Sequence, residues 1–356
     1  MASIEDVARE TGVSTATVSR ALRGLSSVAE PTRARVQRVA KELGYVPSAA
    51  ATSLATGRTR AVGLVTPHVS RWFFAVCIET VEAVMRTHGY DVLLIILPPG
   101  QRIEPGPLAA LPPARPRLES ELLRKRVDAT VILSLRLGED EAELLRGLGR
   151  TAVYLGPPVP GLRTVGVDDV EVGRLATRHL VELGHRRLRF LGGGVDERDW
   201  APQLRRYIGF QEELAAAGLR EAGPMVDADL TVEEGQRVGR RLAGAGDADG
   251  ATGFVCCCDE LAIGVIHELR AAGVRVPEDV SVVGVDDHPF SALIDLTTVS
   301  QPVADQAETA ARWLLEALSA VGEDWNHRIG GPVAAPLEQL PVVLVVRGTT
   351  APPVAR

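Results

Sequence analysis

The spacing of apolar and polar residues predicts two short amphipathic helices near the start of the chain. Apolar residues recur at helical intervals over residues 4–8 and again over residues 13–22, with Gly12 between the two runs. Glycine at such a junction permits a sharp turn, so the apolar side of the second helix can pack on the first. The residues expected to face outward from the second helix are Thr15, Ala16, Ser19 and Arg20.

Both predicted helices carry start signals. Ser3 followed by Asp6 forms a capping box, in which each side chain accepts a hydrogen bond from a backbone N–H of the other residue. Ser14 can accept a hydrogen bond from the free N–H groups of the second helix. Two capped helices joined by a glycine turn form a helix-turn-helix, a structure that proteins use to read DNA.

From residue 61 onward, short apolar runs alternate with stretches of helical periodicity. The predicted strands cover residues 61–65, 91–96, 129–133, 152–155, 188–191, 253–257 and 280–285. The predicted helices cover residues 73–88, 118–126, 171–183, 203–217 and 260–272. Such alternation is typical of an α/β fold with doubly wound parallel sheets. The core is too long for one sheet, so we expect two lobes with a ligand cleft at the carboxyl ends of their strands.

Charge is unevenly distributed along the chain. Residues 1–60 hold nine Lys or Arg against five Asp or Glu, whereas the remaining residues hold 30 against 41. The first helices could also be a structural cap on the core. However, a basic head on an acidic body is the pattern of a nucleic-acid-binding module joined to a domain with another task. The charge distribution therefore favours DNA binding.

Other functional classes are disfavoured by the motifs that are missing. The chain starts with a charged amphipathic helix instead of a signal peptide, and no apolar run could span a membrane, so we expect a cytoplasmic protein. Cys77 and the cysteines at 256–258 lack zinc-site spacing and are interpreted as core residues. The glycines at 192–194 lack a dinucleotide-binding register, and the histidines lack metal-ligand spacing. We expect no enzyme activity, metal or cofactor.

A longer set of motifs resembles the LacI/GalR family of transcriptional regulators. In the head, the matching residues are Val7-Ala8, Gly12-Val13-Ser14, Thr17-Val18-Ser19-Arg20, Thr32-Arg33, Val36 and residues 43–47. In the core, they are residues 59–63, 183–187, 276–284, Asp286-Asp287 and 346–353. The matches extend over nearly the whole chain. The resemblance implies a three-helix DNA-binding domain, a hinge helix and a two-lobed core like that of the periplasmic binding proteins.

The resemblance also implies domain boundaries. The DNA-binding domain is expected at residues 1–46, the hinge helix and linker at 47–60, and the effector-binding and dimerisation core at 61–350. In this family the chain passes between the lobes three times, which we expect near residues 165, 297 and 328. The expected N-lobe then covers about 61–165 and 297–328, and the expected C-lobe covers about 166–296 and 329–350.

The family's DNA contacts carry over to the second helix and its surroundings. Thr15 and Ala16 stand at the specificity positions, where small side chains can contact a thymine methyl or form one hydrogen bond, and Arg20 can fork onto a guanine. Contacts to phosphates fix the register on the duplex without reading its sequence. The further residues expected at the DNA are Ser3, Ser14, Thr17, Ser19 and Thr32.

The segment 47–57 joins the head to the core. It begins with proline, continues with small residues and ends at glycine, and by itself it is too short and too polar for a stable helix, which favours a flexible linker. In the resembling family, this segment folds on the operator. Leu54 would then be the wedge that opens a central base step in the minor groove, and Ala51 and Ala55 would let two hinge helices approach closely.

Five core residues match effector-binding positions of the family. Arg206 and Asp286 would supply a charged fork and a carboxylate, which suit hydroxyl-rich ligands. Phe73 and Phe74 match an aromatic pair that packs a ligand ring. Cys258 stands where the family commonly has an asparagine that grips adjacent hydroxyls, which argues against a simple hexose.

Alternatives stay open around this pocket. Arg71-Trp72 stands where the family usually has Asn-Pro, and Trp72 and Trp200 could each extend the aromatic wall or be ordinary packing residues. Arg206 could be a salt-bridge partner at the surface instead of a ligand contact.

These inferences together predict a homodimeric transcriptional regulator, most simply a repressor of a catabolic or transport operon. Two heads would bind an inverted-repeat operator, and a small effector, a carbohydrate or derivative, would release it. The alternatives are a regulator that answers a non-sugar co-repressor or a protein partner, and a solute-binding protein, which would lack the head. The Pro-rich stretch at 98–116 is interpreted as a solvated loop, with a partner site as the alternative.

Overall fold

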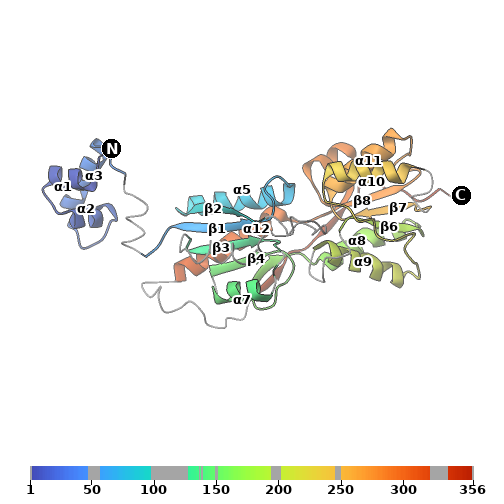
Figure 1. Ribbon diagram of the computed structural model, residues 1–356, viewed down its shortest axis with the longest axis horizontal. Coiled ribbons are helices and arrows are strands. Elements are labelled where there is room, and N and C mark those ends of the chain that lie inside the picture. Colours follow the sequence, from blue (N-terminus) through green and yellow to red (C-terminus); the bar gives the residue numbers. More distant parts are fainter. Residues whose placement is uncertain are drawn as a thin grey trace, which may run out of the picture. The chain divides into compact units, whose positions relative to one another are not determined.

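The protein divides into two compact units, Met1–Arg60 and Ala61–Arg356 (Figure 1). The structure is a computed structural model that describes residues 2–46, 57–97, 127–135, 137, 139–148, 151–193, 202–244, 250–320 and 336–354. Most of the expected hinge, with Ala51, Leu54 and Ala55, lies outside the described residues. Outside them also lie the Pro-rich stretch at 98–116, the expected helix at 118–126, and Trp200.

The first unit is a bundle of three short helices around a small apolar core. These helices are α1 (Ile4–Thr11), α2 (Thr15–Leu22) and α3 (Glu30–Glu42). Each helix contributes fully buried side chains to the core, among them Val7, Val18, Ala21 and Val36. The periodic apolar residues thus bind the three helices together and leave the polar face of α2 exposed.

The predicted helix signals of the first unit are confirmed. The Ser3 hydroxyl accepts a hydrogen bond from the Asp6 backbone N–H, and the Asp6 carboxylate accepts one from the Ser3 backbone N–H at 2.9 Å. Gly12 ends α1 in the left-handed conformation, with φ of 68°, and Ser14 caps α2 by accepting from the Thr17 N–H. The helix-turn-helix therefore starts, turns and restarts where its sequence signals lie.

The N-lobe of the second unit is built on a parallel sheet of six strands, in the order β10-β5-β4-β3-β1-β2. Their bounds are Ala61–Thr66 (β1), Asp91–Ile96 (β2), Ala129–Leu133 (β3), Ala152–Leu155 (β4), Arg163–Gly166 (β5) and Leu337–Gln339 (β10). Helices α5 (Trp72–Thr87) and α12 (Val303–Ala320) share one core with the sheet. Helix α7 (Glu139–Gly147) adds Leu145 to a second core (Figure 1).

The C-lobe is built on a sheet of five strands, in the order β11-β9-β8-β7-β6, of which only the β11–β9 pair is antiparallel. Its strands are Leu188–Leu191 (β6), Gly253–Cys256 (β7), Ser281–Asp286 (β8), Thr297–Ser300 (β9) and Val343–Val345 (β11). Its helices are Asp169–Glu182 (α8), Pro202–Ala216 (α9), Val232–Ala243 (α10), Asp259–Ala271 (α11) and the short 3-10 helix Pro289–Ile294 (η2). These two doubly wound sheets confirm the predicted α/β fold.

The chain passes between the lobes at three positions, one of which differs from that expected. The first crossing, between β5 and α8, lies close to the expected residue 165. The second comes just after Ser300, close to the expected residue 297, because the whole of β9 pairs with β8 in the C-lobe. The third lies at 340–342 instead of near 328, because β10 pairs with β5 and β11 pairs with β9. The expected boundary near 328 is therefore wrong.

Glycines allow two pairs of C-lobe helices to pack with their backbones in contact. A Cβ atom at Gly173 of α8 would overlap the carbonyl oxygen of Arg206 on α9, and one at Gly209 would overlap the carbonyl oxygen of Val170. The α10–α11 pair uses Gly235 and Gly264 in the same way. Close packing of α8 on α9 matters for the site because α9 carries Arg206.

We expect Gly173→Ala to lower the free energy of unfolding by about 1–3 kcal/mol, because the added methyl forces α8 and α9 apart. Urea denaturation of both variants checks this expectation, with Gly147→Ala as the control, since nothing lies within 4 Å of a Cβ at Gly147. Equal denaturation midpoints for the two variants would contradict the close-packing role of Gly173.

Candidate functional site

The expected DNA-reading residues lie on the accessible side of the first unit. Thr15, Ala16 and Arg20 of α2 are exposed, as is Ser14, whereas Thr17, Ser19, Ser3 and Thr32 are half-buried. The Ser14 and Thr17 hydroxyls lie 2.9 Å apart and hydrogen-bond with each other. The fold therefore keeps the small specificity side chains of α2 free of core packing.

Arg20 differs from Arg9 and Arg33 in its electrostatic partners. Arg9 pairs with Asp6 at 2.6 Å, and Arg33 pairs with Glu30 at 2.9 Å. The exposed Arg20 side chain forms no ion pair with a described residue. Its guanidinium charge is therefore available to a ligand outside the unit, and the predicted guanine contact is compatible with its position.

In the second unit, Asp286 ends β8 at the boundary between the lobes. Its φ is 121° and that of Asp287 is 56°, so the chain turns sharply where the strand stops. The Asp286 carboxylate is buried and accepts a hydrogen bond of 2.5 Å from the side-chain amide of Gln301, which follows β9. Burial raises the pKa of Asp286 to about 6, while Arg206 opposes this shift.

Arg206 is held inside the C-lobe by other groups. Its Nε donates to the Asp169 carboxylate at 2.9 Å, and its Nη1 donates to the Cys257 carbonyl at 2.5 Å. Arg206 and Asp169 are both buried. Burial alone would lower the pKa of Arg206, but the carboxylates of Asp169 and Asp286 raise it above its ordinary value. Arg206 thus belongs to a buried ion pair, not to a surface one.

Asp259, at the first position of α11, fixes the loop that carries Asp286 and Asp287. This fully buried carboxylate accepts hydrogen bonds from the His288 N–H at 2.8 Å and from the hydroxyls of Ser291 and Thr298, both at 2.7 Å. Burial, followed by the nearby Asp286, raises the pKa of Asp259 to about 8. Asp259 therefore ties η2 and β9 to α11 and sets the position of the site loop.

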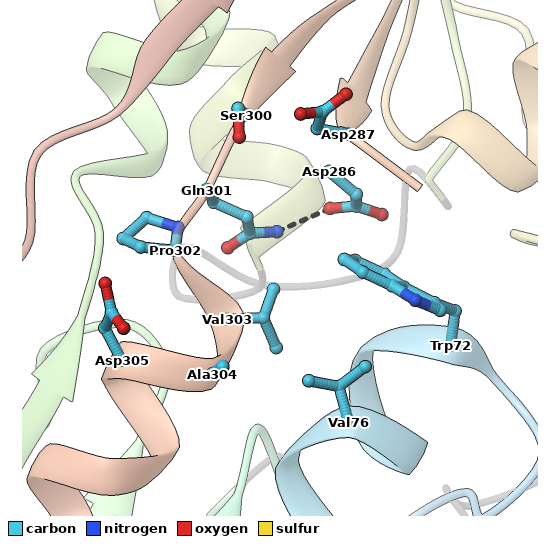
Figure 2. A pocket seen from close by; sticks show the side chains of 10 residues that line it. All are labelled: Trp72, Val76, Asp286, Asp287, Ser300, Gln301, Pro302, Val303, Ala304 and Asp305. Atoms are coloured by element: carbon cyan, nitrogen blue, oxygen red, sulfur yellow. Dashed lines mark hydrogen bonds between the residues drawn. The ribbon is translucent and has the colours of Figure 1, made fainter. Parts of the chain in front are cut away.

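A cavity of about 240 Å³ lies beside Asp286, between elements of both lobes (Figure 2). Its lining residues are Trp72, Val76, Asp286, Asp287, Ser300, Gln301, Pro302, Val303, Ala304 and Asp305. Helix α5 forms the part of the cavity wall that belongs to the N-lobe. The ends of β8 and β9 form the part that belongs to the C-lobe. Polar groups thus meet an aromatic ring in one concave site, the usual composition of a small-molecule pocket.

The structure places one of the five expected effector residues, Asp286, in the cavity wall. Phe74 is buried in the N-lobe core with the Phe73 ring packed edge-on against it at 5.2 Å. Cys258 is buried as the cap of α11. None of these three, nor Arg206, is among the lining residues. Their roles as ligand contacts stay predictions.

Sequence reasoning missed Gln301 as a site residue, because no motif marks it. It belongs to the site only because the chain crosses between the lobes there and brings its amide to Asp286. Trp72 was left open between the aromatic wall and ordinary packing, and it lies in the wall. Trp72 directly precedes Phe73 at the start of α5, and this position next to an expected effector residue could have identified it as a wall residue.

Three contacts join the two lobes beside the cavity. The Arg71 guanidinium lies 3.6 Å from the Glu260 carboxylate, and the Trp72 backbone N–H donates to the same carboxylate at 3.5 Å. The Trp72 ring packs on the His288 ring, with 5.4 Å between their centres. The first residues of α5 are therefore in contact with α11 and with the site loop.

Two further searches bear on function, within the part of the chain that the structure describes. No group of three or more His, Cys, Asp or Glu side chains there is arranged to hold a metal ion. None of the described helices has the length and apolar character needed to cross a membrane.

Comparison with known proteins finds a separate match in each of the two units. Residues 3–48 match the domain described as "Bacterial regulatory proteins, lacI family", and residues 177–350 match the "Periplasmic binding protein-like domain". The HTH-type transcriptional regulator RegA of Clostridium saccharobutylicum is 33% identical over 331 residues, which cover 89% of this chain and 92% of RegA. The chain belongs to the LacI family.

Other LacI-family relatives match at similar levels. The HTH-type transcriptional repressor PurR of Mannheimia succiniciproducens is 31% identical over 325 residues, covering 90% of this chain and 92% of PurR. A solved structure, the transcriptional regulator CelR–cellobiose complex, is 29% identical with a TM-score of 0.66, and the match covers 98% of this chain and 100% of that one. The protein is thus a LacI-family transcriptional regulator with a helix-turn-helix, and not an enzyme.

Proposed function

We propose that this LacI-family protein is a cytoplasmic repressor that binds an inverted-repeat operator as a homodimer. A small effector, a carbohydrate or a derivative of one, binds in the cavity beside Asp286 and releases the DNA. The observation that carries this proposal is that both lobes contribute to one cavity, with Trp72 from the N-lobe and Asp286 from the C-lobe. A ligand there favours one arrangement of the lobes over another, and operator binding responds if it depends on that arrangement.

Exposed apolar side chains support the homodimer. Leu94 and Ile96, on the edge strand β2, are 40% and 44% exposed, and Phe290 and Leu293 of η2 are 59% and 78% exposed. An exposed edge strand offers unpaired backbone groups to another chain, and exposed apolar side chains beside them or on η2 can add contacts. A second copy of this chain would cover them. Sedimentation velocity of the full-length protein tests this, since a monomer at micromolar concentration would contradict it.

The size and lining of the cavity support a small polyhydroxylated effector. At about 240 Å³ it lies just below the range of about 300–1,000 Å³ for pockets that hold drug-sized ligands, so a single ring is favoured. Carboxylates, an amide and a hydroxyl can pair with ligand hydroxyl groups, while Trp72 can cover a ring face. The cellobiose complex of the relative CelR shows that a family member binds a carbohydrate.

The experiment that tests the proposal combines ligand and DNA binding. An operator is selected from random DNA with the purified full-length protein, and fluorescence anisotropy then measures its affinity with and without each compound of a sugar panel. We expect an inverted repeat and at least one compound that lowers the affinity. Selection of no common sequence would overturn the proposal of a sequence-specific repressor. If an operator is found but no sugar lowers the affinity, the carbohydrate effector is overturned.

For the DNA-reading helix, we expect Arg20→Ala to weaken operator binding by about 1–3 kcal/mol and to relax selection at one base pair of each half-site. The reason is that a guanidinium which forks onto guanine reads its identity, whereas a phosphate contact does not. The control is Arg9→Ala, which removes the same charge from α1, where Arg9 already pairs with Asp6. Equal losses on operator and on random DNA would contradict base reading by Arg20.

A further inference from the structure

The wall of the cavity carries only negative formal charges. Three of its ten lining residues are carboxylates, Asp286, Asp287 and Asp305, and none is Lys, Arg or His. Asp287 is compensated from outside the wall by Arg347, whose guanidinium lies 2.6 Å from its carboxylate. The negative charges of Asp286 and Asp305 therefore act on a ligand bound in the cavity.

Asp286 is the more important of these two because it is more than nine-tenths buried. Its Oδ1 accepts the hydrogen bond from Gln301, a neutral amide, and its other oxygen receives none from a described residue (Figure 2). The two arginines near it are engaged with other carboxylates, Arg206 with Asp169 and Arg71 with Glu260. Arg206 and Arg71 act on Asp286 only through space, and no described cation forms an ion pair with it, so an ammonium that hydrogen-bonds to its other oxygen stabilises the bound state.

An aromatic face completes the arrangement. In Figure 2 the indole of Trp72 lies between the Asp286 carboxylate and Val76, at the N-lobe side of the cavity. The face of an indole attracts a cation within about 6 Å, and it also covers the apolar face of a sugar ring. A carboxylate and an indole on one cavity wall are the two groups that bind an ammonium most favourably in proteins.

We propose that the effector of this site is a polyhydroxylated molecule with a protonated amine, an amino sugar or an amino polyol. Its ammonium lies at Asp286 and Trp72, while its hydroxyl groups meet Gln301, Ser300 and Asp305. The inference rests on the proposed function and narrows its ligand class. A neutral sugar supplies no ion pair to Asp286, and an anionic one, such as a sugar phosphate, is repelled by the carboxylates of the same wall.

Matched ligand pairs test the proposal on the full-length protein in phosphate buffer, which contains no amine. The cationic members are D-glucosamine, D-galactosamine, D-mannosamine and 1-amino-1-deoxysorbitol. Each is compared with its neutral counterpart, and glucosamine also with N-acetylglucosamine, which keeps the ring and loses the charge. A ligand that binds only the folded state raises the melting temperature, so thermal shift identifies the binders and calorimetry gives their Kd. We expect at least one amine to bind, and to bind at least tenfold more tightly than its neutral partner.

Variants identify the residues that hold the ammonium. Asp286→Asn keeps the size of the side chain and removes its charge, and we expect it to weaken the amine at least 30-fold or so, as for loss of one partner of a buried charge pair. Trp72→Leu is expected to weaken it about 2- to 30-fold. Glu308→Gln is the matched control, because Glu308 is an exposed carboxylate of α12 outside the cavity wall, and it should leave the Kd unchanged.

Several results would overturn the proposal. They are the absence of a shift with every amine, a neutral or N-acetylated sugar that binds as tightly as its amine, and an amine whose Kd is the same for Asp286→Asn. If Asp286→Asn does not fold, the comparison of glucosamine with N-acetylglucosamine on the unaltered protein decides. A neutral sugar that binds and releases the operator would overturn this inference and support the proposed function. An amine that binds without affecting operator binding would support this inference and overturn the proposed role of the cavity in releasing the operator.

Discussion

Replacement of Arg206 by alanine is expected to lower the free energy of unfolding of the core by about 3–5 kcal/mol. The variant leaves the Asp169 carboxylate buried without its partner, and it also removes the donor to the Cys257 carbonyl. Removal of one member of a buried ion pair is costly because the remaining charge has neither water nor a counter-charge. Urea denaturation measures the loss of unfolding free energy, provided that the spectroscopic signal reports on the second unit.

Two further variants make this result specific. Arg174 pairs with Glu212 at 2.6 Å on the same two helices, but both side chains are exposed, so Arg174→Ala should cost about 1 kcal/mol or less. Replacing Arg206 by Met and Asp169 by Leu together should recover part of the stability, because no unpaired charge remains. If Arg206→Ala folds with unchanged stability and loses only ligand binding, the expected role of Arg206 as an effector contact is supported instead.

The second large effect that we expect is a loss of core stability between about pH 4 and pH 8, caused by Asp259. Its pKa is about 8 in the folded protein and 3.8 as the ordinary value, so the folded state binds this proton more tightly than the unfolded state does. Stability from this group is therefore fully present below about pH 4 and is lost as the pH rises towards 8. The slope is up to about 1.4 kcal/mol per pH unit.

Asp286 acts in the same direction over a narrower range, since its pKa is raised only to about 6. Above that pH Asp259 continues to contribute to the slope. Asp259→Asn should flatten the dependence of unfolding free energy on pH between 6 and 8, as measured by urea denaturation at each pH. Ser291→Ala removes one donor to the same carboxylate, so it should lower stability and keep the slope. If the unfolding free energy of Asp259→Asn depends on pH as strongly as that of the unaltered protein, the loss of stability with rising pH has another source.

The sequence predicted those elements whose own residues carry the signal. The capping box at Ser3, the turn at Gly12 and the cap at Ser14 are local hydrogen-bonding devices, and all three are present. Strands β2, β3 and β4 have the predicted bounds, because apolar residues dominate each run; β3 and β4 are buried along their length, whereas β2 is a largely exposed edge strand.

Helix α10 was missed although Thr231 caps it locally, and helix α12 was missed as well, whereas other missed features depend on distant partners. Strand β10, Leu337–Gln339, is exposed along its length, so no apolar pattern marks it, and only its pairing with β5 makes it a strand. The crossing at 328 was therefore placed too early. Arg206 was matched by family likeness, but its pairing with Asp169, 37 positions away in the chain, follows only from the packing of α8 on α9 through Gly173 and Gly209.

The strands near the end of the chain have a consequence for how the protein is made. β10 belongs to the sheet of the N-lobe and β11 to that of the C-lobe, so both sheets are completed by residues 337–345. A chain that emerges from the ribosome in order can form neither complete sheet until these residues have left the exit tunnel. Until then β5 and β9 each lack an edge partner, and an open strand edge of this kind can pair with another chain.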